Sequence, residues 1–178
     1  MNRMFGLLAG ILVGLIVLIA LVGVIGAVLP RTHTVASIAF YHQPVDSVWA
    51  AVTDIKKTPA WRSDIKSVER SPDRNGDRVW KLIGTDGSGS LEIIESNPNS
   101  SYRIRVADDA QTVGGTWVFY FKVEDGGTRL TLHDDGYISN PFHRFLATRV
   151  WGLNAPLDSY LKALGRKFGE AVKPAHTG

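Results

Sequence analysis

The chain opens with an unbroken hydrophobic run that predicts a membrane-spanning helix. Residues 5–29 contain no charged side chain over 25 positions, and Pro30 follows them. At about 1.5 Å per residue, such a helix crosses a hydrocarbon core of roughly 30 Å with some tilt to spare. The run exceeds the apolar region of a secretory signal, about 7–15 residues, and the small residues near its end make a poor cleavage site. We therefore expect residues 1–30 to be a retained anchor and residues 31–178 to form one soluble domain.

Few charges flank this run, so they say little about the side of the membrane on which the domain lies. Arg3 and the α-amine precede the run, Arg31 follows it, and the next basic residue is Lys56. Because cytoplasmic flanks carry the excess of Lys and Arg, the small N-terminal excess favours a domain outside the cytoplasm. We expect a single-pass membrane protein, and the sequence leaves the side of its domain open.

Glycines recur on one face of the expected membrane helix, at Gly6, Gly10 and Gly14. Small residues at a spacing of four let two helix backbones approach closely in lipid. Glycine is also common in membrane helices in general. The pattern is typical of an ordinary membrane helix and is also compatible with a homo-oligomer formed through this face.

Beyond the anchor, short segments of alternating polarity separated by turn residues predict a β-meander. The Asn75-Gly76 pair is a strong hairpin signal. Two short helical segments follow the first strand, where Val45, Val48 and Val52 recur at helical spacing and again near residues 55–61. The seven strands that we expect span residues 34–41, 65–69, 78–83, 90–95, 101–107, 116–124 and 128–132.

The last long segment has the periodicity of an amphipathic helix over residues 141–172. We expect Pro156 to kink it, because the proline ring clashes with the carbonyl four residues earlier, and Gly152 to ease the bend. A seven-stranded antiparallel sheet must cover its apolar face, and this helix is the only long apolar one available. The pattern predicts an α+β fold, with the sheet curled around the C-terminal helix and an apolar cavity left between them.

Composition narrows the partners and the chemistry. All 17 acidic residues and 19 of the 20 basic ones follow the hydrophobic run, so the domain is nearly neutral, and we expect no nucleic-acid partner. The absence of cysteine excludes disulfides, thiolate nucleophiles and cysteine-based zinc sites. Residues 84–90 are glycine-rich but lack the Gly-Lys-Ser/Thr of a phosphate loop. We expect neither a metal nor a cofactor.

Strand parity predicts which side chains face the cavity, since side chains alternate between the two faces of a sheet. Lys122 should face water, so residues of odd number in its strand should point inward. The inward residues that we expect to contact a ligand are Trp80, Tyr102, Trp117, Phe119, Phe121, Leu132 and, from the helix, Leu153. Trp80, Tyr102 and Trp117 are the best candidates for orienting it, because each has a polar atom that needs a partner. The same side chains would also fill a dry core.

The densest titratable cluster is His133-Asp134-Asp135, at the end of the last strand. It is either a general base or weak metal site, or a polar strand end that leads into a turn. Parity places Asp134 at the mouth of the cavity. If the domain is an enzyme, His133, Asp134 and Tyr102 are the candidate acid and base groups. The other histidines lie near the ends of elements, where we expect them to be solvated: His33, His42, His143 and His176.

Four motifs occur in a recognisable order: Pro-Val-x-x-Val-Trp at residues 44–49, Trp61, Gly-Gly-Thr at residues 126–128 and Asn-Pro-Phe at residues 140–142. With the order of elements, they resemble the START-like, helix-grip superfamily called SRPBCC, and within it the polyketide cyclase/dehydrase-like branch. The resemblance covers roughly residues 33–172. It implies a ligand cavity, because members bind lipids, sterols, polyketides and hormones, and some are cyclases or hydrolases. A shared fold does not transfer a reaction, and the anchor departs from the typical soluble member.

Three functions are therefore open. The first is the binding of a hydrophobic small molecule or lipid beside the membrane. The second is a polyketide cyclase or dehydratase-like enzyme. The third is a membrane interaction or assembly protein that associates through the glycine face. We expect the first, because the sequence contains no complete catalytic constellation.

Overall fold

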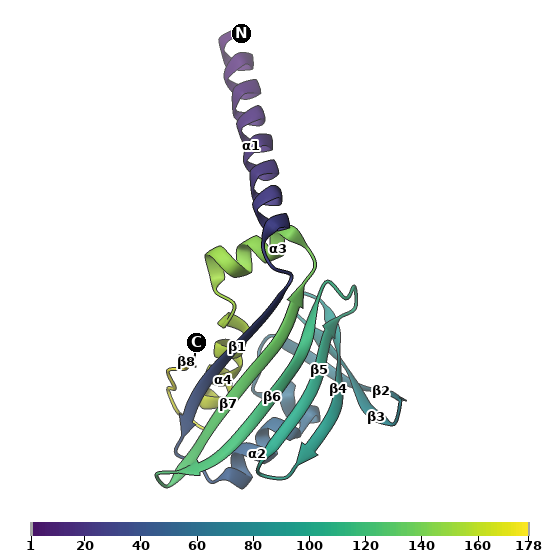
Figure 1. Ribbon diagram of the computed structural model, residues 1–178, viewed down its shortest axis with the longest axis vertical. Helices are drawn as coiled ribbons and strands as arrows, with labels where there is room; N and C mark the ends of the chain where they lie inside the picture. Colours follow the sequence, from purple (N-terminus) through teal and green to yellow (C-terminus); the bar gives the residue numbers. More distant parts are fainter. Residues whose placement is uncertain (1, 178) are drawn as a thin grey trace.

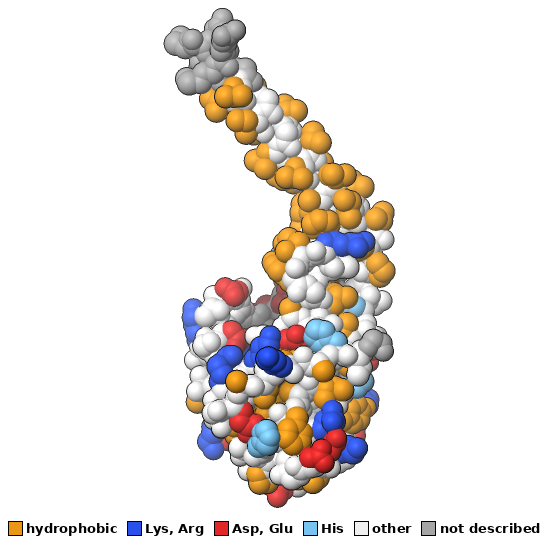
Figure 2. Space-filling model, turned by 90° about the vertical axis from the view of Figure 1, so that its left-hand side faces the viewer, with side chains coloured by type: hydrophobic (Ala, Val, Ile, Leu, Met, Phe, Trp, Pro, Cys, Tyr) orange, Lys and Arg blue, Asp and Glu red, His pale blue; other side chains and the backbone are white. Residues whose placement is uncertain are grey.

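A computed structural model describes residues 2–177, with side chains from Leu7 onward. A single helix, α1 (Asn2–Val28), projects from a domain made of a curled sheet and shorter helices (Figure 1). Its segment Leu7–Val28 has a mean hydropathy of 3.1 and is almost entirely uncovered by the rest of the chain. Apolar side chains cover its visible face, whereas charged side chains are scattered over the domain (Figure 2). By length and composition, α1 is able to cross a membrane.

The domain contains one antiparallel sheet of eight strands in the order β2-β3-β4-β5-β6-β7-β1-β8. The strands are β1 (Thr32–Tyr41), β2 (Ile65–Arg74), β3 (Asp77–Gly84), β4 (Ser88–Asn97), β5 (Ser101–Asp108), β6 (Val113–Glu124), β7 (Gly127–Ile138) and β8 (Ala175–Thr177). All seven expected strands are present. The eighth strand, β8, was not predicted because its three residues are exposed and have no hydrophobic pattern.

The segment after β7 does not form the single kinked helix that we expected. It contains α3 (Pro141–Leu146), a π-helical turn η2 (Ala147–Trp151) and α4 (Ala155–Lys167). Gly152, with φ +86°, breaks the helix between η2 and α4 in a conformation that glycine adopts readily. Pro156 lies in the first turn of α4, where its missing N–H would have no partner in any case. The proline therefore begins a helix instead of bending one.

The core lies between the concave face of the sheet and α4, whose leucines Leu157, Leu161 and Leu164 are fully buried. The hydroxyl of Tyr41 on β1 donates a 2.9 Å hydrogen bond to the Leu161 carbonyl. At the end of the sheet away from α1, α2 (Val45–Thr53) and the 3₁₀-helix η1 (Ile55–Ala60) connect β1 to β2. There Trp49 packs edge-on against Phe121, with ring centroids 5.1 Å apart. Aromatic side chains therefore pack against α2 in this part of the core.

The last turns of α1 pack directly on α3. The ring of Phe142 lies against Gly23, and Gly26 leaves room for the backbone of α3. The buried guanidinium of Arg144 donates a 2.8 Å hydrogen bond from Nε to the Gly26 carbonyl. Contacts between side chains and backbone therefore hold α1 to the domain, in addition to the short linker before β1.

The expected glycine face of α1 is uncovered where the structure describes it. A methyl group added at Gly10 or Gly14 would meet no atom within 4 Å. Gly6 belongs to α1 but precedes the residues whose side chains are described. Association of two chains through this face stays a prediction.

Candidate ligand-binding site

An apolar cavity of about 250 Å³ lies between the sheet and the C-terminal segment, at the end of the domain nearest α1. This end holds the start of β1, the start of β6 and the end of β7, and η2 and the start of α4 form the facing wall. The apolar lining consists of Val106, Val113, Gly114, Trp117, Ile138, Ala147, Trp151, Gly152, Leu153, Ala155 and Pro156. Ligand pockets in proteins are typically of this kind, concave and mostly apolar.

A second hollow, of about 380 Å³, adjoins the first at the same end of the domain. It is lined by the β3–β4 hairpin, the ends of the neighbouring strands and the start of β6. The two cavities share Val106, Val113 and Gly114. The two cavities therefore share a wall.

The polar residues of the first cavity are His33 and Asp134, on the neighbouring strands β1 and β7. His33 Nε2 lies 3.2 Å from Asp134 Oδ2, and the two side chains are only 12% and 10% exposed. Opposite His33 in the ladder is Gly136, where a side chain would collide with the imidazole. The missing side chain lets the imidazole reach diagonally to the carboxylate.

One oxygen of this pair is left without a partner. Asp134 Oδ1 is buried and accepts no hydrogen bond from any described residue. A buried acceptor without a donor costs about 1–3 kcal/mol. A ligand hydroxyl that donates to this oxygen would remove that cost. The pair can therefore orient the polar end of an otherwise apolar molecule.

The structure divides the sequence-predicted site residues into distinct groups. Trp117, Leu153 and Asp134 line the first cavity. The predicted ligand contacts that instead belong to the packed core are Tyr102, Phe119, Phe121 and Leu132. Parity assigned these four to the inner face correctly, but α2 and α4 cover that part of the face. Phe119, for example, lies 5.4 Å from the Tyr160 ring of α4, measured between centroids.

Two further predicted residues, Trp80 and His133, also lie outside both cavities. Trp80 lines a separate hollow of about 420 Å³, where the Arg70 guanidinium is 5.5 Å and the Lys56 ammonium 5.9 Å from its ring centroid. His133 packs edge-on against Tyr120, with centroids 5.5 Å apart. Because Asp134 is its neighbour in the strand, the two side chains leave the sheet on opposite faces. The structure therefore does not bring His133 to the cavity.

Tyr102 has the surroundings of a core residue and not those of a proton donor. Its side chain is buried, and its hydroxyl has no hydrogen-bond partner among the described residues. Burial raises the pKa of the Tyr102 phenol far above its usual range, against a smaller lowering by Arg78. The phenol therefore keeps its proton at ordinary pH, and it does not line either cavity.

His33 is a site residue that we did not predict, since we expected it to be solvated. A usable signal was the parity of β1, in which Ala39 and Tyr41 are buried and His33 shares their odd numbering. The close approach to Asp134 had no signal of its own, because 101 residues separate the two in the chain. Within the described residues, no three His, Asp or Glu side chains gather in a way that could hold a metal ion.

Several solved structures are similar to this one. The di-domain ARO/CYC StfQ from the steffimycin biosynthetic pathway superposes with a TM-score of 0.61 at 14% identity, over 78% of this chain and 52% of that one. The chain thus spans about half the length of the di-domain protein. The Zhui aromatase/cyclase from Streptomyces sp. R1128 has a TM-score of 0.59 at 15% identity, over 77% of this chain and 93% of that one.

A third similar structure is Ara h 8.0201, with a TM-score of 0.60 at 15% identity, over 78% of this chain and 99% of that one. At such identities the likeness shows the fold alone, a helix-grip fold of the SRPBCC type. A search of curated proteins finds no match to this sequence. The family model described as "Polyketide cyclase / dehydrase and lipid transport" matches residues 32–169, most of the chain and nearly all of the domain. The chain therefore belongs to the polyketide cyclase/dehydrase and lipid transport family.

Proposed function

We propose that this chain is a membrane-anchored binding protein that holds a hydrophobic small molecule or lipid in the cavity between η2 and the sheet. The observation that carries the proposal is the position of this apolar cavity, at the end of the domain to which the apolar helix α1 is attached. The contacts of Gly26 and Arg144 support retention of α1, because cleavage before the domain would remove a partner of a buried guanidinium.

The lining favours an amphipathic ligand. Trp117 and Leu153 offer apolar surface, and the unpartnered oxygen of Asp134 offers one place for a donating hydroxyl group. A cavity of about 250 Å³ is small for a whole lipid, but the adjoining hollow provides further room for a chain. We therefore expect a molecule with an apolar body and one polar end.

Native mass spectrometry of the full chain, purified from its own host in detergent micelles, tests this function. We expect a reproducible adduct of a few hundred daltons that Trp117→Ala abolishes. Trp80→Ala is the matched control, since Trp80 is also a half-buried tryptophan of the sheet but lies outside both cavities. Ala147→Trp, which fills the cavity from η2, provides a second variant if Trp117→Ala fails to fold. An adduct that survives both cavity variants, or no adduct at all, would overturn the proposal.

The His33–Asp134 pair also favours a second candidate function, a cyclase or dehydratase-like enzyme. An imidazole hydrogen-bonded to a carboxylate beside an apolar cavity is an arrangement that can move a proton to or from a bound substrate. Asp134→Asn would then abolish turnover of a polyketide-like substrate. Asp135→Asn would not, because Asp135 is exposed and bonds to Thr34 Oγ1 outside the cavity. Full activity in Asp134→Asn would exclude this mechanism.

A further inference from the structure

The segment Pro141–Trp151, which contains α3 and η2, carries an exposed apolar surface beside α1. Phe142 is 41% exposed, and Val150 and Trp151 are each 60% exposed. Outside α1, six large hydrophobic side chains of the described residues are exposed, and four of them lie at this end of the domain: Val113, Phe142, Val150 and Trp151. In Figure 1 the segment runs across the base of α1 and not along it. We call Pro141–Trp151 the crossing segment.

The contact between Phe142 and Gly23 sets the depth of the crossing segment relative to α1. The apolar span Leu7–Val28 has 22 residues, a length of about 33 Å that matches a hydrocarbon core of roughly 30 Å. Gly23 lies five residues before Val28, or about 7.5 Å inside the end of that span. If α1 crosses the bilayer, the Phe142 ring on Gly23 lies at the depth of the acyl chains.

The charge of the crossing segment fits the same position. Arg149 is exposed, and no acidic residue occurs between Asp135 and Asp158. Basic side chains at a membrane surface are attracted to anionic lipid headgroups, by about 1 kcal/mol each. Tryptophan is enriched at the level of the headgroups, where one end of its ring is apolar and the other is wet. Trp151 therefore has the chemistry expected of a residue at the interface.

We propose that the crossing segment is embedded in the interface of a phospholipid bilayer, so that the ligand cavity opens toward the lipid and not toward water. Trp151 lies both on this exposed surface and in the cavity wall, so it borders the opening of the cavity. The Arg144 bond to the Gly26 carbonyl keeps α3 at a constant position on α1, so the domain does not swing freely on its linker. This inference rests on the proposed membrane anchor and adds a second contact with the bilayer.

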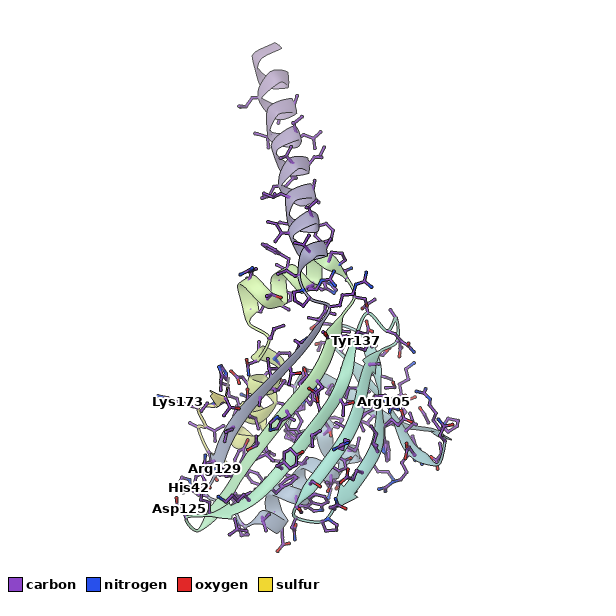
Figure 3. All side chains as sticks on the ribbon, in the orientation of Figure 1. His42, Arg105, Asp125, Arg129, Tyr137 and Lys173 are labelled. Carbon is purple, nitrogen blue, oxygen red and sulfur yellow. The ribbon has the colours of Figure 1, made fainter. Side chains whose placement is uncertain are left out.

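Depth-dependent fluorescence quenching in the full chain tests the inference, because the natural sequence has no cysteine to compete for a label. Val150→Cys, carrying a fluorophore, is reconstituted into vesicles of phosphatidylcholine and phosphatidylglycerol that contain lipids with a nitroxide near the headgroup. Val123→Cys is the matched control: it is also an exposed valine, 66% against 60%. It lies near Asp125, at the end of the domain away from α1 (Figure 3).

We expect shallow nitroxide lipids to quench the Val150→Cys label several-fold more strongly than the Val123→Cys label, and aqueous iodide to show the reverse order. A third variant, Leu15→Cys in the middle of α1, reports on the anchor through nitroxides placed deep in the acyl chains. Deep quenching of Leu15→Cys, with Val150→Cys behaving like Val123→Cys, would overturn the interfacial position of the crossing segment alone. Absence of deep quenching at Leu15→Cys would overturn the proposed anchor and, with it, this inference.

Discussion

Arg144 of α3 reaches back to Gly26 of α1, and its Nε donates a 2.8 Å hydrogen bond to the Gly26 carbonyl. Its Nη1 donates to the Ile138 carbonyl at the end of β7, at 3.2 Å. The side chain is only 2% exposed. The last carbonyls of a helix have no partner within the helix, and they carry the negative end of its dipole. Arg144 therefore satisfies the end of α1 with a charged donor and connects it to the sheet.

Arg144→Met should weaken the attachment of α1 to α3 and to the end of β7. It leaves two buried carbonyls without their donor, and hydrogen bonds from a charged group are worth about 1.5–3 kcal/mol each. We expect a clear loss of thermal stability in the detergent-solubilised full chain, followed by circular dichroism, and a smaller loss in Arg144→Lys, which keeps the charge but not the planar fork. An unchanged unfolding temperature in Arg144→Met would show that the contact contributes nothing to stability.

Gly26→Ala should weaken the contact between α1 and α3, whereas Gly10→Ala should not. A Cβ at Gly26 would lie 2.0 Å from the Pro141 carbonyl oxygen, but a Cβ at Gly10 meets nothing within 4 Å. Both changes gain the same helix propensity, about 1 kcal/mol, so the difference between them isolates the collision. Hydrogen exchange of the α3 amides should accelerate in Gly26→Ala alone. Equal exchange in the two variants would contradict the close packing.

Tyr102→Phe should leave the fold intact and raise its stability. The Tyr102 hydroxyl is buried without a partner among the described residues, and an unpaired buried hydroxyl costs about 1–3 kcal/mol. Removing only the oxygen keeps the ring in contact with Phe119. Urea unfolding of the variant should therefore show a higher midpoint. A lower midpoint would show that the hydroxyl has a hydrogen-bond partner and would make Tyr102 a candidate acid or base group again.

Lowering the pH should destabilise the β5–β6 loop, which borders the cavities. Asp108 Oδ1 accepts a hydrogen bond from the Val113 amide at 3.1 Å, and the carboxylate also bonds to Thr112. Burial alone would raise the pKa of Asp108, but the hydrogen bonds from Thr112 and Val113 outweigh it and hold the pKa below its ordinary 3.8. A carboxyl whose folded-state pKa is lowered stabilises the fold above its unfolded pKa and loses that effect as the pH falls through the folded value.

We therefore expect the protection of the Thr112 and Val113 amides to fall as the pH decreases from about 5 to about 2, once intrinsic exchange is corrected for. Asp108→Ala should lack this protection already at neutral pH. Asp109→Ala is the control, because Asp109 is exposed and bonds to Ser88 instead of the loop amides. Protection that stays constant with pH in the natural chain would show that Asp108 does not hold the loop.

The sequence by itself determined the elements whose signal is local. An uncharged run of 25 residues is enough to predict α1, because a helix of that length and composition is able to cross a bilayer. Alternation of polarity predicted seven strands and their inner faces, and Asn75-Gly76 predicted a hairpin. These patterns arise from the geometry of one helix or strand, so no knowledge of its neighbours is needed.

Only the tertiary structure decided which inner residues are packed and which line a cavity. Strand parity places both Phe121 and Trp117 on the inner face of β6. Phe121 packs against Trp49 of α2, whereas Trp117 lines the cavity between the sheet and η2. The break at Gly152 and the pairing of His33 with Asp134 were decided in the same way. Periodicity specifies the face of an element on which a side chain lies. What lies opposite that face depends on contacts between segments far apart in the chain.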